Sequence, residues 1–298
     1  MTEVLRQRGV IVAALTPWDS GGQLDLAAFD AEIDWLASQS PLAIGVAGVE
    51  VQEYHLLDID QRVDLVRRAT KRVGNVPVIA GVSTPLASRS AEISKKMAEA
   101  GATAVLALSA PKPWAAASTS DEFVRWFTCL ADGSPLPIVI YSNPRTGTEP
   151  SVASLAEVAA HGQIAALKET SRDMTKVLNL CLALAESGLA GVYTNMESLL
   201  TTIHLGGQGA MVPAPALPAA LRILAAHEAG DTDEARRWQS FFAAFPSHWM
   251  RLGLGPAVKA GMHVLGIEVG APGHTFDGLT PGEIAEMSEL FERWGLAG

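Results

Sequence analysis

The most constraining feature of this 298-residue chain is an alternation of short apolar runs with amphipathic segments. The apolar runs are Val10–Leu15, Leu42–Ala47, Val76–Val82, Ala104–Leu108, Pro137–Tyr141, Ile164–Leu167, Ala190–Tyr193 and Ala210–Val212. They show little two-residue alternation, which is typical of strands covered on both faces. Strands that alternate with helices form parallel sheets, and about eight of them close a barrel. The sequence therefore predicts an α/β fold, a (β/α)8 or TIM barrel.

The segments between the runs have the apolar spacing of amphipathic helices. Phe29, Ile33 and Leu36 recur at intervals of three and four residues, so they would share one helix face. Several of these helices open at residues that commonly cap helix N-termini. The predicted caps are Asp60, Ser88, Ser120 and Ser151.

After the eighth run the pattern changes to helices alone. We expect helices at Leu217–Ala229, Asp233–Leu252 with a kink at Pro246, Pro256–Leu265 and Pro281–Trp294. Because this part has no apolar run of the strand type, we divide the chain into two parts. Residues 1–216 would form the barrel, and residues 217–298 a C-terminal helical extension packed on it.

Composition excludes several classes of function. The chain has 22 basic against 32 acidic residues and a net charge of −10, and it lacks the basic stripe that nucleic acid requires. It has neither a signal-peptide core nor an apolar run of roughly eighteen residues that could span a membrane. Cys129 and Cys181 lie in apolar helical patterns and are predicted to be buried. We therefore expect a soluble cytoplasmic protein. The histidines match no metal motif, and we expect no metal or other cofactor.

Two polar residues stand at the C-terminal ends of neighbouring runs. Tyr141 ends the fifth run and Lys168 follows the sixth. Active sites of such barrels lie at the C-terminal ends of the strands, and adjacent strands are about 4.8 Å apart, so an amine and a phenol would meet there. Desolvation lowers the pKa of an amine, and the neutral amine attacks carbonyl groups. The pair therefore predicts Schiff-base chemistry on a keto acid, with Tyr141 as acid and base.

At these residues the chain resembles the family of dihydrodipicolinate synthase and N-acetylneuraminate lyase, which are Schiff-base aldolases on a (β/α)8 barrel with a C-terminal helical extension. The segments that carry the resemblance are residues 9–25 (GVIVAALTPWDSGGQLD), 53–62 (EYHLLDIDQR), 77–82 (PVIAGV), 141–147 (YSNPRTG), 167–170 (LKET), 205–211 (LGGQGAM) and 255–267 (GPAVKAGMHVLGI). The resemblance implies that Lys168 forms the imine and Tyr141 relays protons. It also implies a homo-oligomer, either a dimer or a tetramer built from dimers.

Three departures indicate an activity other than that of the synthase itself. Where family members carry Gly-Thr/Ser-Thr-Gly-Glu after the second strand, this chain has residues 49–53, Val-Glu-Val-Gln-Glu. The tyrosine pair that the synthase carries after its fourth strand is replaced by Ala110–Trp114. The synthase arginine five residues after the tyrosine is shifted, since Arg145 stands at the fourth position and Thr146 at the fifth.

We therefore expect a class I, metal-independent lyase that acts on pyruvate or a longer 2-keto acid. It would make or break a carbon–carbon bond, or eliminate water, and an aldehyde could be the second substrate. The predicted substrate-binding residues are Glu50, Val51, Gln52, Thr170, Asn143, Thr194 and Met211. Thr170 or backbone amides of residues 50–52 would hold the carboxylate, and Glu50 would face the mouth of the barrel.

Three alternatives remain open. The chain could be dihydrodipicolinate synthase itself, despite the departures. It could be a metal-dependent barrel whose oxygen ligands are Glu50, Glu53, Glu169 and Asn195. It could also be a regulator that binds a keto acid without catalysis, although a mere binder would need neither Tyr141 nor Lys168.

Overall fold

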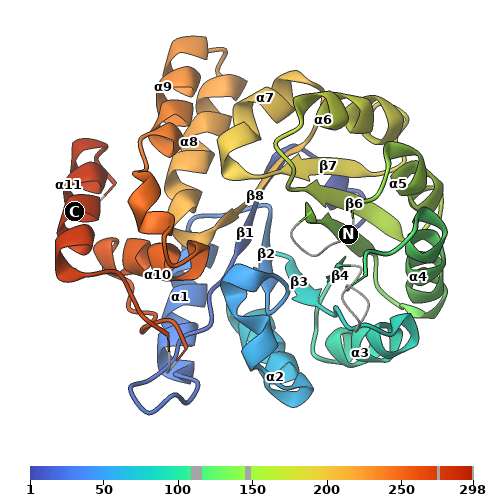
Figure 1. Cartoon of the computed structure of the whole chain (residues 1–298), viewed down its shortest axis with the longest axis horizontal. Coiled ribbons are helices and arrows are strands. Elements are labelled where there is room, and N and C mark those ends of the chain that lie inside the picture. Colours follow the sequence, from blue (N-terminus) through green and yellow to red (C-terminus); the bar gives the residue numbers. More distant parts are fainter. Residues whose placement is uncertain (109–115, 145–148, 274–275, 297–298) are drawn as a thin grey trace.

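The computed structural model describes residues 1–108, 116–144, 149–273 and 276–296. Its centre is a closed barrel of parallel strands in which each strand pairs with the next and β8 returns to β1 (Figure 1). The strands are β1 (Gly9–Ala13), β2 (Ala43–Val46), β3 (Val78–Gly81), β4 (Ala104–Leu108), β5 (Ile138–Ser142), β6 (Ile164–Glu169), β7 (Gly191–Thr194) and β8 (Gly209–Pro213). All their residues are buried, which confirms the predicted α/β barrel with strands covered on both faces.

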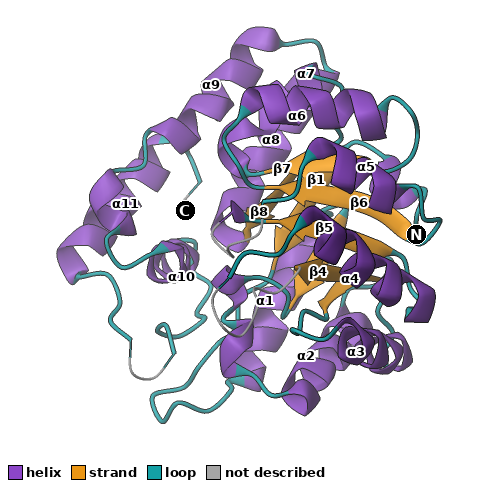
Figure 2. Cartoon of the chain, turned by 45° about the vertical axis from the view of Figure 1, so that its right-hand side comes forward, coloured by secondary structure: helices purple, strands orange, loops and turns teal. Residues whose placement is uncertain are grey.

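Helices surround the strands on the outside (Figure 2). They are α1 (Leu26–Ser38), α2 (Ile59–Arg72), α3 (Ala87–Glu99), α4 (Ser120–Gly133), α5 (Val152–Ala159), α6 (Met174–Leu180), α7 (Leu199–His204) and α8 (Leu217–Glu228). A π-helical turn, Cys181–Ala185, continues α6. Within the described residues, no helix is both long and apolar enough to cross a membrane.

Three of the four predicted helix N-caps lie at other residues in the structure, and two of these three belong to capping boxes. The N-cap of α2 is Asp58 rather than Asp60, because Gln61 then lies three residues later and returns a hydrogen bond to the backbone of Asp58. The N-cap of α4 is Thr119 rather than Ser120, and that of α3 is Leu86 rather than Ser88. The N-cap of α5 is Ser151, as predicted.

Cys181 is buried as expected, but Cys129 is exposed, because it lies on the face of α4 opposite the buried residues of that helix.

The N-terminal end of the barrel is closed by the segment before β1. Leu5, in the short turn Val4–Arg6, is fully buried, and the hydroxyl of Tyr193 donates to the carbonyls of Leu5 and Gln7. A Cβ atom at Gly191 would lie 2.1 Å from the Leu5 carbonyl oxygen, so glycine is required there. This plug fills the lower barrel and leaves the C-terminal end for a site.

The last helices lie beside the barrel, at the left of Figure 1. α8 packs on β1 as well as on α9 (Thr232–Ala243), and the division of the chain at residue 217 stays a prediction. The expected kinked helix 233–252 is wrong: α9 ends at Ala243, and a 3-10 turn, Ser247–Met250, follows Pro246. α10 (Leu254–Val264) packs across the turn that follows β2, and α11 (Pro281–Arg293) packs on α10.

Candidate functional site

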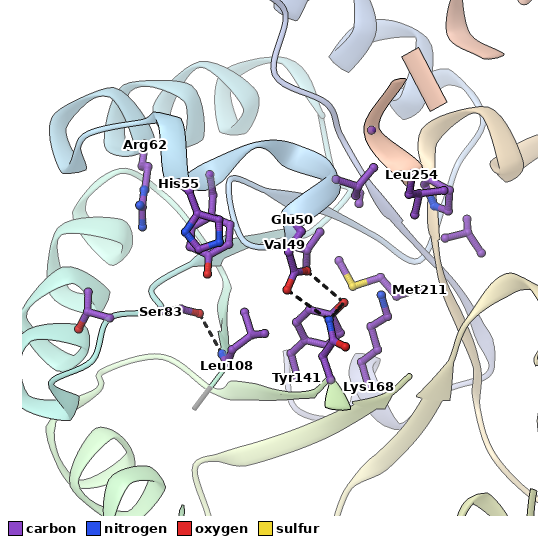
Figure 3. Close-up of a pocket in the computed structure, with 18 of the residues that line it drawn as sticks. Val49, Glu50, His55, Arg62, Ser83, Leu108, Tyr141, Lys168, Met211 and Leu254 are labelled. Carbon is purple, nitrogen blue, oxygen red and sulfur yellow. Dashed lines mark hydrogen bonds between the residues drawn. The ribbon is translucent and has the colours of Figure 1, made fainter. Parts of the chain in front are cut away.

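A cavity of about 770 Å³ opens at the C-terminal ends of the strands (Figure 3). It is lined by Ala13, Val49, Glu50, Val51, Tyr54, His55, Arg62, Ser83, Thr84, Pro85, Leu108, Tyr141, Asn143, Lys168, Met211, Val212, Pro213, Leu254 and Gly255. These residues come from strand ends, from the loops after them and from the starts of α2 and α10. The cavity therefore lies where barrels of this type carry their active sites.

Lys168 and Tyr141 meet in this cavity. They are paired residues on β6 and β5, and the amine of Lys168 lies 4.6 Å from the centre of the Tyr141 ring. Lys168 is 9% exposed, and among the described residues its amine has no hydrogen-bond or ion-pair partner. Burial lowers the pKa of Lys168 to about 8, although the charges of Glu50 and Glu197 act in the opposite direction. Roughly a tenth of the amine is therefore neutral at pH 7, far more than for a lysine with the ordinary pKa of 10.5.

The Tyr141 hydroxyl belongs to a small polar cluster with Glu50 and Asn143. The hydroxyl donates toward Glu50 Oε2 at 3.4 Å. The side-chain amide of Asn143 donates to Glu50 Oε1 and to the Tyr141 hydroxyl, each at 3.2 Å. Burial and the Glu50 charge raise the pKa of Tyr141, so the phenol stays protonated and can act as a proton donor.

The loop that carries Glu50 is held in place by the side chain of Gln52. Its amide nitrogen donates to the carbonyls of Ala14 and Gly45, both at 2.7 Å. Its oxygen accepts from the backbone N–H groups of Gly48 at 2.8 Å and Val49 at 3.0 Å. Gln52 is fully buried and does not line the cavity. It therefore orients the loop rather than contacting a ligand.

The same loop carries strained backbone and a tight approach to β3. Ala47 and Glu53 have positive φ angles of 52° and 51°, which are uncommon for residues other than glycine. A Cβ atom at Gly81 would lie 2.1 Å from the Ala47 carbonyl oxygen. Glycine on β3 thus lets this loop fold over the barrel.

Glu53 ties the loop to the C-terminal helices. Glu53 Oε2 accepts from Lys259 of α10 at 2.8 Å and from the Trp18 indole at 2.6 Å, and Oε1 accepts from the backbone N–H of Gly273 at 2.9 Å. Lys259 is 3% exposed, so this ion pair is shielded from water. The network places the start of α10, with Leu254, at the cavity wall.

The structure brings together six of the nine predicted site residues and separates three. Lys168, Tyr141, Glu50, Val51, Asn143 and Met211 line the cavity. Gln52, Thr170 and Thr194 do not: the Thr170 hydroxyl donates to the Ser142 carbonyl at 2.6 Å, and Thr194 is fully buried against Thr202. Their contact with substrate stays a prediction.

The sequence interpretation missed an aromatic and cationic part of the cavity. The rings of Tyr54 and His55 are tilted by 35° with centres 3.8 Å apart, and the Arg62 guanidinium of α2 lies 4.9 Å from the centre of the Tyr54 ring. In sequence, Arg62 is one of several arginines in α2, and helical spacing alone does not distinguish it from those at the surface. The loop Ala110–Trp114, together with Arg145 and Thr146, lies outside the described residues.

The oxygen ligands of the metal-dependent alternative are not gathered in one place. Glu53 forms an ion pair with Lys259, and Glu169 forms one with Lys176 at 3.1 Å. The Asn195 side chain caps a short helical turn. Only Glu50 of the four lines the cavity. Within the part of the chain that the structure describes, three or more His, Cys, Asp or Glu side chains nowhere form a metal-binding group.

Comparison with known proteins gives matches along almost the whole chain. The sequence model of the Dihydrodipicolinate synthetase family matches residues 6–276. A 4-hydroxy-tetrahydrodipicolinate synthase from an Exiguobacterium species is 31% identical over 268 residues, which cover 89% of this chain and 90% of that protein. Another from Corynebacterium diphtheriae is 27% identical over 291 residues, covering 96% and 94%.

Solved structures share the fold. A prophage protein of the dihydrodipicolinic acid synthase family from E. coli K12, in complex with pyruvate, superposes with a TM-score of 0.87 at 22% identity. The match covers 97% of this chain and 99% of that one. A monomeric dihydrodipicolinate synthase variant gives a TM-score of 0.88 at 20% identity and covers 99% of both chains. At such identities the likeness supports the barrel and its helical extension.

Proposed function

The chain belongs to the Dihydrodipicolinate synthetase family, a family of pyruvate-dependent lyases, and we propose that Lys168 is its imine-forming residue and Tyr141 its proton relay. The substrate would be pyruvate or a longer 2-keto acid. One observation carries the proposal: Lys168 presents a buried amine, free of an ion pair among the described residues, to a cavity and directly beside a phenol. No cofactor is needed for this chemistry.

The proposed reaction begins when the neutral amine of Lys168 attacks the 2-keto carbon. The carbinolamine oxygen takes a proton from the Tyr141 hydroxyl and leaves as water, which gives a protonated imine. In cleavage, the deprotonated Tyr141 takes the proton of the hydroxyl on the fourth carbon, the bond between the third and fourth carbons breaks, and the imine accepts its electron pair. In condensation, Tyr141 takes a proton from the third carbon, and the enamine that results attacks an aldehyde. Glu50, whose carboxylate lies 3.4 Å from the phenol, would accept the Tyr141 proton in the steps where the phenol acts as a base.

The keto-acid carboxylate needs donors near the Lys168 amine. Two backbone N–H groups, those of Glu50 and Val51, belong to residues that line the cavity and form no hydrogen bond among the described residues. The N–H of Gln52 is already bound to the Val49 carbonyl. We therefore assign the carboxylate to the amides of Glu50 and Val51, which would hold it without a cationic side chain.

A second candidate function is 4-hydroxy-tetrahydrodipicolinate synthase, favoured by the names of the relatives that are 31% and 27% identical. The Glu50 side chain beside Tyr141, where the family resemblance implies a hydroxyl, favours a different second substrate. We expect condensation of pyruvate with aspartate semialdehyde to be very slow. Robust activity with this pair would assign the synthase function instead. A non-catalytic keto-acid regulator would show no turnover with any pair.

The oligomeric state and location remain predictions. By the family resemblance we propose a homo-oligomer, a dimer or a tetramer. The proposed location in the cytoplasm rests on the sequence pattern described above. Light scattering after gel filtration would measure the mass in solution. A monomer at all concentrations would refute the assembly without affecting the site, since all the residues in the proposed chemistry come from one chain.

The direct test is reductive trapping with a panel of 2-keto acids. Borohydride reduces an imine to a stable amine, so the intact mass after treatment identifies each bound keto acid. We expect a single adduct with pyruvate or with a longer 2-keto acid. Complete absence of adducts across the panel, with the protein folded by circular dichroism, would refute imine chemistry.

A further inference from the structure

Arg62 is a buried cation without an anionic partner. It lies in the first turn of α2, is 8% exposed, and lines the cavity. Its Nε and Nη1 atoms are buried and have no hydrogen-bond partner among the described residues. Taking a guanidinium out of water costs several kcal/mol unless a counter-charge or hydrogen bonds offset it.

Other arginines and lysines of the same region are paired. Arg68 donates to Asp30, Arg72 to Asp34, and Lys259 to Glu53. The ring of Tyr54, 4.9 Å from the Arg62 guanidinium carbon, supplies a cation–π contact, but a ring face does not replace the hydrogen-bond acceptors that these N–H groups had in water. Burial lowers the pKa of Arg62, and the charge of Asp58 only partly opposes this, since the Asp58 side chain caps α2. The charge of Arg62 is therefore available to a ligand.

The groups around Arg62 favour an anion and add no second charge. Burial and the Arg62 charge lower the pKa of His55, so His55 is neutral near pH 7. Ser83 is 7% exposed; its hydroxyl oxygen accepts from the Leu108 N–H at 2.9 Å, which leaves its proton free to be donated. One cation and one hydroxyl match a carboxylate, whereas a phosphate dianion would need more charge and more donors.

Arg62 and Lys168 stand at opposite ends of the cavity in Figure 3, with Glu50 between them. Arg62 is not among the charges that shift the pKa of Lys168, whereas Glu50 is. An anion at Arg62 would thus belong to the part of a substrate that lies farthest from the imine. The keto-acid carboxylate is held by the backbone amides of Glu50 and Val51, and the Glu50 side chain would repel a further anionic group placed between that carboxylate and Arg62.

We propose that Arg62, Tyr54, His55 and Ser83 form a binding site for a carboxylate on the aldehyde half of the substrate. The inference rests on the proposed function: the keto acid is held at Lys168, and the aldehyde that is added or released carries its carboxylate toward Arg62. The enzyme would then discriminate between acidic aldehydes and neutral aldehydes of the same size.

A kinetic experiment tests this discrimination. The condensation of pyruvate with 4-oxobutanoate is compared with that of its neutral amide, 4-oxobutanamide, in the wild type, Arg62→Gln, Arg62→Lys and Arg67→Gln. Arg67 is the matched control, because it lies on the same helix, carries the same charge and has a 47% exposed side chain outside the cavity. We expect the wild type and Arg67→Gln to prefer the carboxylate by roughly 10- to 100-fold in kcat/KM, the usual worth of a charged hydrogen bond. Arg62→Gln should lose this preference, and Arg62→Lys should retain part of it.

A binding measurement keeps the test independent of turnover and of folding. Calorimetry would give dissociation constants for glutarate and for neutral glutaramide with the same four proteins, and circular dichroism would check that each is folded. Glutarate affinity should fall at least about tenfold in Arg62→Gln only. If pyruvate is trapped on Lys168 but glutarate affinity and aldehyde preference do not depend on Arg62, this inference fails and the proposed function stands. If no imine forms but glutarate binding depends on Arg62, the proposed function fails and the carboxylate site stands.

Discussion

Lys168 lies directly opposite Tyr141 because β6 carries one extra residue near its start. Ile138 pairs with Ile164, but Val139 pairs with Ala166, so Ala165 has no partner on β5. Both Ala165 and Ala166 pack in the interior of the barrel, and this bulge changes the side-chain alternation of the strand. With an unbroken register, Tyr141 would face Leu167, which packs outside the barrel interior. The bulge therefore brings the amine and the phenol together.

Removal of the Tyr141 hydroxyl should separate proton transfer from packing. Tyr141→Phe keeps the ring in its buried site, so the free energy of unfolding should change by about 1 kcal/mol or less. Turnover should fall by roughly two to four orders of magnitude, because a positioned acid–base group is lost. Slow imine trapping at Lys168 should survive.

The measurement pairs a thermal melt with single-turnover kinetics on the keto acid identified by trapping. A much lower melting temperature would make Tyr141 chiefly structural. A normal melt with wild-type turnover would mean that another group, such as Glu50 or a bound water, relays the proton.

The pH dependence of imine formation should report the pKa of Lys168. The neutral amine is the nucleophile, so the trapping rate should rise with pH and level off above about 8, rather than above the ordinary value of 10.5. The Glu50 charge raises this pKa, so Glu50→Gln should move the midpoint to lower pH. The exposed Glu289→Gln, which changes the net charge equally, should leave the midpoint in place. A midpoint near 10 in the wild type would contradict the desolvation of Lys168.

Glu32 should make the fold less stable as pH rises. It is fully buried on α1, accepts from the Leu15 N–H at 2.7 Å, and burial raises its pKa to about 8. The folded state thus binds a proton that the unfolded state releases near pH 4.5, and the stabilisation is complete below that pH and lost as pH rises through 8. The free energy of unfolding should fall by about 2–5 kcal/mol over this range.

Chemical denaturation at a series of pH values measures this slope. Glu32→Gln cannot ionise, so its unfolding free energy should change much less between pH 5 and pH 8. An equal slope in the variant and the wild type would assign the pH dependence to other groups.

The sequence was sufficient to predict the barrel and the proximity of Tyr141 and Lys168. Every apolar run overlaps its strand, and the bounds of run and strand differ by at most two residues at either end, because strands buried on both faces need continuous hydrophobicity. Tyr141 and Lys168 followed from their positions at two strand ends. The bulge at Ala165 could not be foreseen, since a small residue in an apolar strand fits a regular register equally well.

The remaining site residues depend on how distant segments pack. Gln52 looked like a ligand-binding residue, but four backbone groups of the fold satisfy its side-chain amide. The sequence pattern did not single out Arg62, and only the fold of the loop before α2 buries it against Tyr54. Such contacts depend on tertiary structure, and local sequence patterns do not record them.

The most direct test of the central claim is to locate the trapped keto acid in the chain. Wild-type protein and Lys168→Ala are treated with pyruvate and borohydride, and the adduct is mapped by peptide mass spectrometry. Lys259 serves as an internal control, because it is buried but held by Glu53 and two backbone carbonyls. The account predicts one reduced adduct on Lys168 in the wild type and none in a folded Lys168→Ala. An adduct on Lys259 or Lys112, or one that persists in Lys168→Ala, would contradict it.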